Sequence, residues 1–473
     1  MKPRAERRLQ RAGLRVAVVG GGVSGWTAAY RLRALLGPTA AITVYEGTEV
    51  IGGKLRTVEL DGVPCDVGAE AFLVRRPEAV ALIEELGLGA QLASPTCARA
   101  TVRAGGHTVR LPTRTLMGVP ADAADVADVL SAEGAATVAA EPQLPPLTIP
   151  AGDISLGKLV RERLGDEIVD RLVDPLLGGV YAGGADALGL RAVLPALADA
   201  LDAGAGSLTA AAGYVLPTAA NPAPVFGTLR GGLSALIEEL AAASGAETHL
   251  GAPVRELRPS PEGWTLTLAP ETSPPATLTA DAVLLAVPAP AARRLLDGVA
   301  PAAAQAFAEV ELASMAVVAL TFGRDTELPD ASGVLIGAGE RHDDGTPFTA
   351  KAFTFSSRKW QHYADRGVFV RGSVGRFGDQ EALRATDDEL IRRVRADLAE
   401  LTGITAPPAT ATVRRWGGGL PQYTVGHLER VARIERAVSE LPRFEIAGAT
   451  LHGVGIPACI ATADAAARRL AHG

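Results

Sequence analysis

The stretch Val16–Gly25 joins four short apolar residues to three glycines in the spacing G-x-G-x-x-G. Gly20, Gly22 and Gly25 allow, in that order, a tight turn, close approach of the backbone to a phosphate, and packing of the next helix on the strand. The free N–H groups at the start of that helix can bind a diphosphate at its positive end. The motif therefore predicts a strand at Arg15–Val19 that leads into a nucleotide-binding turn.

The residues that follow complete a βαβ unit over positions 15 to 60. Apolar residues recur at helical spacing through Gly25–Leu36, which predicts a helix there. A second strand is predicted at Ile42–Tyr45. Glu46 follows at the interval expected of a carboxylate that accepts hydrogen bonds from ribose hydroxyls. The glycine motif alone would be weak evidence for nucleotide binding. Together with the strand, the helix and Glu46, it predicts a dinucleotide-binding site. Gly52-Gly53 after the acid is typical of flavin proteins, which predicts that Lys54 lies near the cofactor.

A second glycine-rich segment lies near the other end of the chain, where Phe444–Ala449 precedes Gly453–Ile460. Pro457 suits the first turn of a helix that runs to about Leu470, since it lacks an N–H that would be unsatisfied there. The positive end of that helix would stabilise negative charge on a reduced flavin ring by about 0.3–2 kcal/mol. A cofactor that needs both ends of the chain is extended and has two parts, so we expect FAD.

Composition limits the alternatives. At 473 residues, 48% hydrophobic and 21% charged, the chain is globular and large enough for two or three domains. A net charge of −7 argues against binding to nucleic acid. Cys65, Cys97 and Cys459 lack the spacing of a disulfide framework or a zinc site, which favours a reducing cytoplasm. No apolar stretch is long enough to cross a bilayer, and the basic start Met1–Arg8 lacks the apolar core of a signal peptide.

The expected fold class is α/β and α+β, with three interleaved domains. Residues 1–75, 218–297 and 416–473 are predicted to form a Rossmann-like FAD-binding domain. Residues 76–97 and 298–415 are predicted to form a substrate domain around a mixed sheet, and residues 98–217 an inserted helical domain.

Three local patterns support this division. Alternating segments around Ala316–Phe322, Thr349–Phe355 and Val368–Val374 predict a mostly antiparallel sheet. Within the alanine-rich insert, Leu156–Val173 has the pattern of an amphipathic helix, and Asp174–Gly183 has that of a glycine-broken turn.

Proline-rich linkers are predicted at Pro142–Pro150 and Pro217–Pro224, and a helix at Asp387–Leu401.

Four more motifs narrow the interpretation: Gly68–Arg76, Val173–Gly183, Arg415–His427 and Gly453–Pro457. With the first glycine motif they resemble the oxygen-dependent protoporphyrinogen and coproporphyrinogen III oxidases. These belong to the amine-oxidase-like superfamily of glutathione-reductase-like flavoproteins, and the chain is most similar to the Gram-positive bacterial coproporphyrinogen III oxidases. The resemblance covers nearly the whole chain in the right order.

The resemblance implies a set of FAD contacts, with Val254 as a backbone clamp on the adenine. The set is Gly20, Gly21, Gly22, Val23, Ser24, Gly25, Glu46, Gly47, Lys54, Gly68, Ala69, Glu70, Ala71, Val254, Trp416, Gly455, Ile456 and Pro457. Many relatives have Pro and Ser at Ala69 and Ala71, and Asp at Ala458, so the details of flavin contact differ here.

The implied reaction is the six-electron oxidation of coproporphyrinogen III to coproporphyrin III in haem biosynthesis, with O₂ reduced to H₂O₂. Protoporphyrinogen IX is a second expected substrate. Electron pairs would pass to flavin N5, so no residue is nominated as catalytic acid, base or metal ligand. The resemblance also implies Arg76 and Arg99 as the candidates for binding substrate propionates, and the planar guanidinium of arginine suits carboxylates. His427 and His452 are interpreted as structural or solvated.

Other functions stay open at this point. An amine oxidase or carotenoid desaturase of the same superfamily would share the cofactor motifs, and a porphyrin-binding chaperone would keep FAD only as a structural element. Transient contact with a ferrochelatase is expected, as is either a monomer or a homodimer. The expected location is the cytoplasm, with peripheral contact to a membrane left open.

Overall fold

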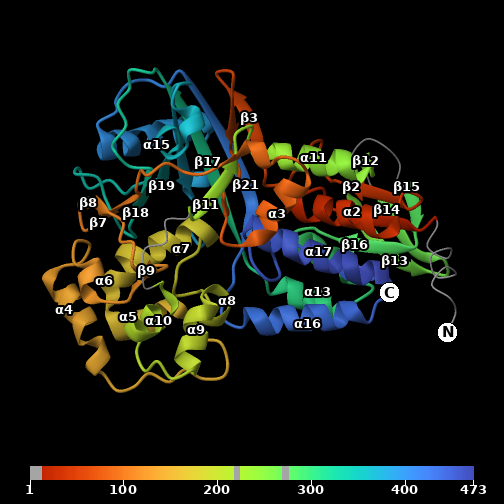
Figure 1. Cartoon of the computed structure of the whole chain (residues 1–473), viewed down its shortest axis with the longest axis horizontal. Helices are drawn as coiled ribbons and strands as arrows, with labels where there is room; N and C mark the ends of the chain where they lie inside the picture. Colours follow the sequence, from red (N-terminus) through yellow and green to blue (C-terminus); the bar gives the residue numbers. More distant parts are fainter. Residues whose placement is uncertain (1–12, 218–223, 269–275, 473) are drawn as a thin grey trace.

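The computed structural model describes residues 13–217, 224–268 and 276–472 (Figure 1). The predicted basic start, Met1–Arg8, and most of the predicted linker at Pro217–Pro224 lie outside the described residues. The remaining chain forms a parallel-sheet body, a second and larger sheet, and a helical region that lies below the larger sheet in Figure 1.

A five-stranded parallel sheet draws its strands from three separate parts of the chain. Its spatial order is β12-β2-β1-β16-β22. The strands are β1 (Arg15–Val19), β2 (Ala41–Tyr45), β12 (Glu247–His249), β16 (Ala282–Leu285) and β22 (Phe444–Ile446). The strands predicted at Arg15–Val19 and Ile42–Tyr45 are confirmed as β1 and β2, and the last strand of the chain lies in the same sheet as the first.

Helices cover one face of this sheet, and helices with a small antiparallel sheet cover the other. Val16 and Val18 of β1 face the first layer, whereas Ala17 and Val19 face the second, as the two-residue period of a strand requires. The first layer is α2 (Val23–Leu36), α3 (Pro77–Glu85), α11 (Ser234–Ser244) and α17 (Ile456–His472). The second is β13 (Val254–Ser260), β14 (Gly263–Leu268), β15 (Ala276–Ala280), α12 (Ala289–Leu296), α13 (Pro301–Ala308) and α16 (His427–Ser439).

The second large sheet has seven strands in the order β21-β17-β20-β19-β18-β7-β8. Only the β18–β7 pair is parallel, so the predicted mostly antiparallel sheet is confirmed. Helix α15 (Asp387–Thr402), also predicted, packs on one face through Leu390, Val394 and Leu398. The strands are β7 (Thr101–Ala104), β8 (His107–Arg110), β17 (Leu312–Phe322), β18 (Gly333–Ile336), β19 (Ala350–Phe355), β20 (Val368–Val374) and β21 (Thr410–Pro421).

The helical region has a core of its own, built largely from Leu and Val of its short helices. These are α4 (Ala132–Ala140), α5 (Leu156–Leu164), α6 (Asp166–Ile168), α7 (Asp174–Tyr181), α8 (Leu190–Val193), α9 (Pro195–Asp202) and α10 (Leu208–Val215). The remaining short elements are β3 (Thr57–Leu60), β4 (Val63–Asp66), β5 (Phe72–Leu73), β6 (Leu92–Ala93), β9 (Thr115–Leu116), β10 (Val119–Pro120), β11 (Phe226–Leu229) and α14 (Ser356–Lys359).

Three expectations for residues 98–217 were wrong in detail. Residues 101–110 form β7 and β8 rather than helix, because β7 pairs with β18 and β8 pairs with β7 at the edge of the larger sheet. The predicted helix Leu156–Val173 is divided at Gly165, whose φ is +88°, and its last part, Val169–Val173, is a π-helical turn. The domain boundaries as a whole stay a prediction.

The third error concerns Asp174–Gly183, predicted as a turn. It is helical as far as Tyr181 and ends at Ala182 in the left-handed conformation. Packing of α7 against β18 and β19 outweighs the low helix propensity of its two glycines.

The contact between α2 and β1 depends on Gly25. A Cβ added there would lie 1.8 Å from the carbonyl oxygen of Gly20. We expect Gly25→Ala to lower the free energy of unfolding by about 1–3 kcal/mol, since the helix must move from the strand. Chemical unfolding measures this, with Gly298→Ala as control because a Cβ there meets nothing within 4 Å. Equal stability of the two variants would contradict the close packing.

Candidate active site

The first part of the candidate site is the turn between β1 and α2. Gly20 has φ +109°, and a Cβ there would lie 2.4 Å from the carbonyl oxygen of Ala286. Gly22 precedes α2, which has neither a side-chain cap nor an acidic residue in its first turn. A Cβ on Gly22 would meet nothing within 4 Å. The first-turn N–H groups of α2 are thus left for an anion, and the space beside Gly22 admits one.

Glu46 lies at the carboxyl end of β2 with its carboxylate held from two sides. Oε2 accepts a hydrogen bond of 2.8 Å from the N–H of Gly21. Oε1 accepts bonds of 2.8 and 2.9 Å from the N–H and hydroxyl of Thr48. The backbone carbonyl of Glu46 accepts from Ala252 N at 2.9 Å, which brings the segment before Val254 to the same end of the sheet. A fixed carboxylate with remaining acceptor capacity fits the hydroxyls of a ribose.

Two further glycine-containing segments, residues 52–54 and 68–69, pack against the turn between β1 and α2. The N–H of Gly52 donates to the carbonyl of Gly21 at 2.8 Å, and Ala69 N donates to the carbonyl of Lys54 at 3.0 Å. A Cβ on Gly68 would lie 2.0 Å from that same Lys54 carbonyl oxygen, so only glycine permits the approach. The structure therefore brings together segments 20–25, 52–54 and 68–69.

Helix α17 begins beside the beginning of α2. The hydroxyl of Ser24 donates to the carbonyl of Cys459 at 3.3 Å, across 435 residues of sequence. Burial lowers the pKa of Lys54, and the charge of the Cys459 thiol in α17 partly opposes that shift. The carbonyl of Gly455 accepts from the N–H of Cys459 at 3.0 Å, which makes Gly455 the start of the helix. Two helix N-termini thus converge on one place.

Trp416 lies over the 67–69 segment and is half-buried. Its Nε1 donates to the carbonyl of Val67 at 2.9 Å, and its ring would lie 3.1 Å from a Cβ on Gly68. The guanidinium of Arg414 is 5.0 Å from the centre of the indole. The indole is therefore fixed beside residues 68–69, near where a flavin ring is expected.

Glu70 is buried, and its carboxylate is occupied by protein groups. Arg371 and Lys359 pair with it at 3.0 and 3.2 Å, and the Ser356 hydroxyl donates to it at 2.7 Å. Burial alone would raise the pKa of Glu70, but Lys359, Arg371 and Ser356 together lower it to about 2. Arg371 also donates to the carbonyl of Gly68 at 2.6 Å. Glu70 thus ties the segment that contains Ala69 and Ala71 to the larger sheet, and its contact with cofactor stays a prediction.

The two arginines proposed to bind substrate are exposed, and their side chains contact different residues. Arg76 precedes α3 and pairs with Glu78 at 2.8 Å. Arg99 donates to the carbonyl of Leu111 at 3.2 Å. No contact of the described residues joins the two arginines, so their role with a substrate stays a prediction.

Tyr423 is a site residue that the sequence reasoning did not single out. Its hydroxyl donates to the carbonyl of Ala449 and accepts from the N–H of Gly453, both at 2.7 Å, which holds the loop before α17. It stacks on His427, which is buried and hydrogen-bonded to the carbonyl of Leu451 at 3.0 Å. Burial lowers the pKa of His427 to about 4, so the ring is neutral and structural. The motif Arg415–His427 was the only sequence signal for Tyr423.

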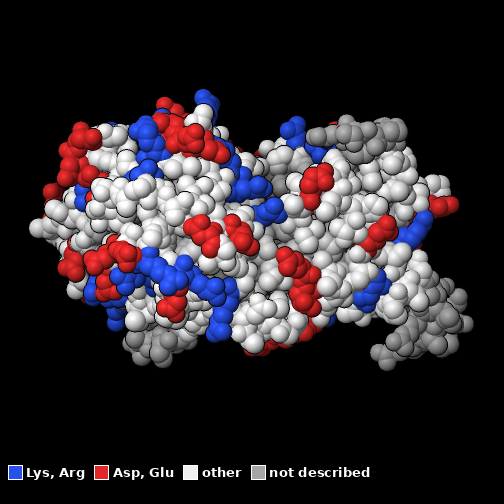
Figure 2. All heavy atoms as spheres, turned by 90° about the horizontal axis from the view of Figure 1, so that it is seen from above, with Lys and Arg blue, Asp and Glu red and all other residues white. Residues whose placement is uncertain are grey.

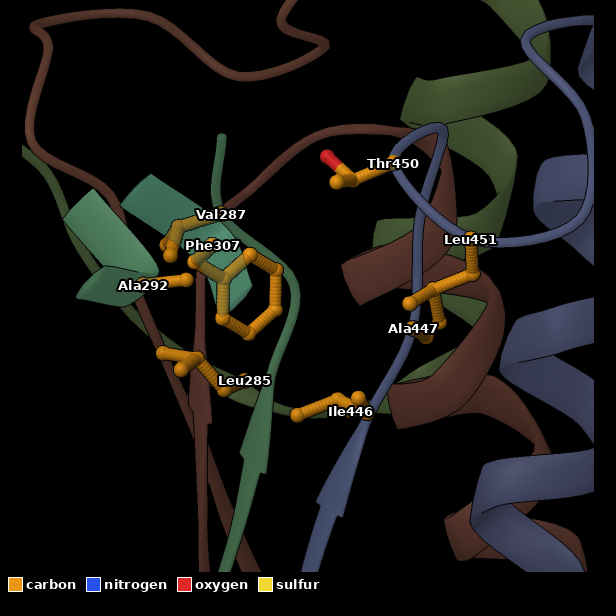
Figure 3. Close-up of a pocket in the computed structure, with 8 residues that line it drawn as sticks. All are labelled: Leu285, Val287, Ala292, Phe307, Ile446, Ala447, Thr450 and Leu451. Carbon is orange, nitrogen blue, oxygen red and sulfur yellow. The ribbon is translucent and has the colours of Figure 1, made fainter. Parts of the chain in front are cut away.

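A small pocket lies at the carboxyl ends of β16 and β22 (Figure 3). Apart from Thr450 its lining is apolar, and the ring of Phe307 faces the side chains of Leu285 and Ile446. Its volume of about 10 Å³ is near the minimum for one water molecule. It is a packing space between α13 and the sheet, too small for a cofactor.

Substitution at Gly22 separates cofactor binding from folding. Its φ of −83° and ψ of −176° are open to any residue, and a side chain there meets no protein atom. We expect Gly22→Val to fold but to purify without flavin absorbance, because the side chain occupies the place of the diphosphate. Thermal unfolding beside flavin-stripped wild type checks folding, and Gly298→Val is the matched control. A yellow Gly22→Val protein would refute this role of the turn.

The charge of Glu70 gives a pH-dependent prediction. In Glu70→Gln the partly buried Lys359 and Arg371 lose their counter-charge, so the free energy of unfolding at neutral pH should fall by about 3–5 kcal/mol. The folded pKa of about 2 lies below the unfolded value. The contribution of Glu70 is therefore complete above the unfolded value of about 4.3 and declines as the pH falls toward the folded one.

Urea unfolding between neutral pH and about pH 3 measures the difference between wild type and Glu70→Gln, which should shrink with falling pH. Glu238→Gln, at an exposed position on α11, is the control. A difference that stays constant over this range would contradict the assigned charge of Glu70.

Comparison with known proteins agrees with this geometry. Residues 23–471 match the model of the flavin containing amine oxidoreductase family. The chain is 44% identical over 453 residues to the coproporphyrinogen III oxidase of Mycobacterium leprae, covering 96% of this chain and 97% of the relative. It is 30% identical to the coproporphyrinogen III oxidase of Bacillus subtilis, covering 95% and 96% of the two chains.

Solved structures give the same result. A crystal structure from Exiguobacterium sp. 255-15, assigned as a protoporphyrinogen oxidase, has a TM-score of 0.85 and 31% identity, covering 97% of this chain and 99% of that one. A putrescine oxidase structure has a TM-score of 0.69 at 18% identity, covering 98% and 100%, and shows likeness of fold alone.

FAD fits the residues present: an uncapped helix start beside open space, a fixed carboxylate and a second helix start converge on one place. The chain therefore belongs to the flavin-containing amine oxidoreductases, in the branch of the coproporphyrinogen III and protoporphyrinogen oxidases, and it is an FAD-dependent oxidoreductase.

Proposed function

We propose that this enzyme oxidises coproporphyrinogen III to coproporphyrin III in haem biosynthesis, with O₂ as the electron acceptor. The observation that carries the proposal is 44% identity to a coproporphyrinogen III oxidase over nearly the full length of both chains. The convergence of the starts of α2 and α17 supports it, because the chemistry needs a flavin at that place. Protoporphyrinogen IX is a second candidate substrate, favoured by 28% identity to a plant protoporphyrinogen oxidase.

The reaction removes six hydrogen atoms from the macrocycle, and three molecules of O₂ take them up as three molecules of H₂O₂. When bound, FAD accepts electron pairs from the substrate and passes them to O₂. The first-turn N–H groups of α2 would hold the diphosphate, and Glu46 would hold the ribose of the adenosine half. The start of α17 and the ammonium of Lys54 would stabilise negative charge near the flavin ring by about 0.3–2 kcal/mol for the helix.

Substrate positioning depends on groups outside the glycine turns. Trp416 would limit access of water to the place of the flavin ring, since it covers Gly68. Exposed Arg76 and Arg99 remain our candidates for propionate groups. A planar guanidinium binds a carboxylate through two parallel hydrogen bonds, which orients the macrocycle as well as holding it.

Location and partners are proposals as well. No helix among the described residues has the length and apolar character required to cross a membrane. Cys65 and Cys459 are buried thiols and Cys97 is exposed, which is compatible with the cytoplasm. Figure 2 shows acidic and basic side chains intermixed over the face that it displays, with no broad basic field for nucleic acid. We also propose that the enzyme contacts a ferrochelatase transiently. Its proposed oligomeric state is a monomer or a homodimer.

Anaerobic mixing with each porphyrinogen tests the function directly. We expect coproporphyrinogen III to bleach the flavin absorbance and to form coproporphyrin III, with H₂O₂ released when O₂ is admitted. Protoporphyrinogen IX should bleach it more slowly, and a polyamine should leave it unchanged. Bleaching by a polyamine alone would indicate an amine oxidase. Flavin that stays oxidised while porphyrin binds would indicate a chaperone.

A further inference from the structure

Two cations lie together where the larger sheet meets the helical region. Lys351 of β19 is only 5% exposed, and its ammonium donates to the carbonyl of Gly178 in α7 at 2.9 Å. Arg376 follows β20 and donates to the carbonyl of Ile336 at 2.9 Å. A Cβ on Gly178 would lie 3.4 Å from Nη1 of Arg376. The two cations therefore meet at Gly178.

Neither cation forms an ion pair with any residue that the structure describes. Asp174 and Asp379 act on Arg376 only from a distance, and the carboxylate of Asp174 accepts from the N–H of Ala185 at 2.6 Å. Burial, with Arg376 nearby, lowers the pKa of Lys351 to about 7. Burial lowers the pKa of Arg376 as well.

This arrangement is costly without a bound anion. Buried lysine and arginine are normally paired with carboxylates. The C-terminal end of α7 supplies the equivalent of about half a negative charge, which does not balance two cations. An anion that enters beside Gly178 would remove the imbalance.

The cations are reachable from one side. Arg376 is half-buried, and Gly179 and Val180 next to Gly178 are exposed. Lys351 points to α7, whereas Ala350 and Phe353 pack in the core under α15, because a β-bulge between Ala350 and Ala352 shifts the alternation of the strand there. The cation pair thus belongs to the face of the larger sheet that meets the helical region.

We propose that Lys351 and Arg376 form a carboxylate subsite that binds one propionate of the tetrapyrrole substrate. This inference rests on the proposed function, since the substrate must carry propionates. Coproporphyrinogen III carries four propionate groups. Arg76 and Arg99 could bind two of them, so further cationic groups are needed for the others. The guanidinium of Arg376 supplies a planar fork and the ammonium of Lys351 a point charge, a combination suited to one carboxylate.

Equilibrium binding of coproporphyrin III and of its neutral tetramethyl ester to the flavin-loaded enzyme tests the subsite. Lys351→Met and Arg376→Gln should each weaken binding of the acid by about tenfold to hundredfold and leave binding of the ester within about twofold. Lys351→Arg should keep most of the affinity, because it keeps the charge. The matched controls are Lys158→Met and Arg384→Gln, both at exposed positions.

The outcomes separate this inference from the function on which it rests. Wild type that neither binds coproporphyrin III nor oxidises its porphyrinogen would overturn both. Wild type that does both, beside variants with unchanged affinity for the acid, would overturn the subsite alone. Equal loss of affinity for acid and ester would indicate a structural role and also overturn it. Where Lys351→Met fails to retain flavin, half-buried Arg376→Gln decides the test.

Discussion

The packing of α17 on α2 determines where the chemistry of this protein can take place. Both helices lie on the same face of the parallel sheet, and their first turns are joined by the hydrogen bond from Ser24 to Cys459. Because both helices begin there, two positive helix ends point to one region instead of dispersing over the surface. A chain with either end removed would keep half of this region, which explains why a cofactor with a diphosphate and a separate redox ring suits the fold.

A buried charge cluster joins that region to the larger sheet. Glu70 lies between Lys359 and Arg371, and Arg371 reaches the carbonyl of Gly68 next to Trp416. Leaving one of these charges unpaired away from water would be strongly destabilising, so the cluster favours one placement of the two bodies relative to each other. Lys351, on the same sheet, has no such acid partner among the described residues and bonds only to a carbonyl. The charges around Glu70 therefore stabilise the fold by pairing with each other, whereas Lys351 is, in our proposal, paired only when substrate binds.

The elements set by local sequence were predictable, and those set by distant partners were not. The strand, turn and helix around Gly22 follow from glycine spacing and side-chain pattern, as does Glu46 at the next strand end. Strand β7 was missed because its partner β18 lies more than 200 residues away in sequence, as the bond from Thr101 to Gly333 shows with a separation of 232 residues. Helix α7 was missed because tertiary packing overrides its glycines. The partners of Glu70, 286 to 289 residues away at Ser356 and Lys359, have no local signal at all.

Amide hydrogen exchange of flavin-free and flavin-loaded protein tests the convergence of the two chain ends most directly. FAD should slow exchange in residues 23–25 and in residues 456–459 together, because the first-turn N–H groups of α2 and α17 face the same cofactor. The N–H of Gly298, remote in sequence and exposed, should exchange equally in both forms. Protection of one helix start without the other would contradict the account, since a single cofactor would then not span both ends of the chain.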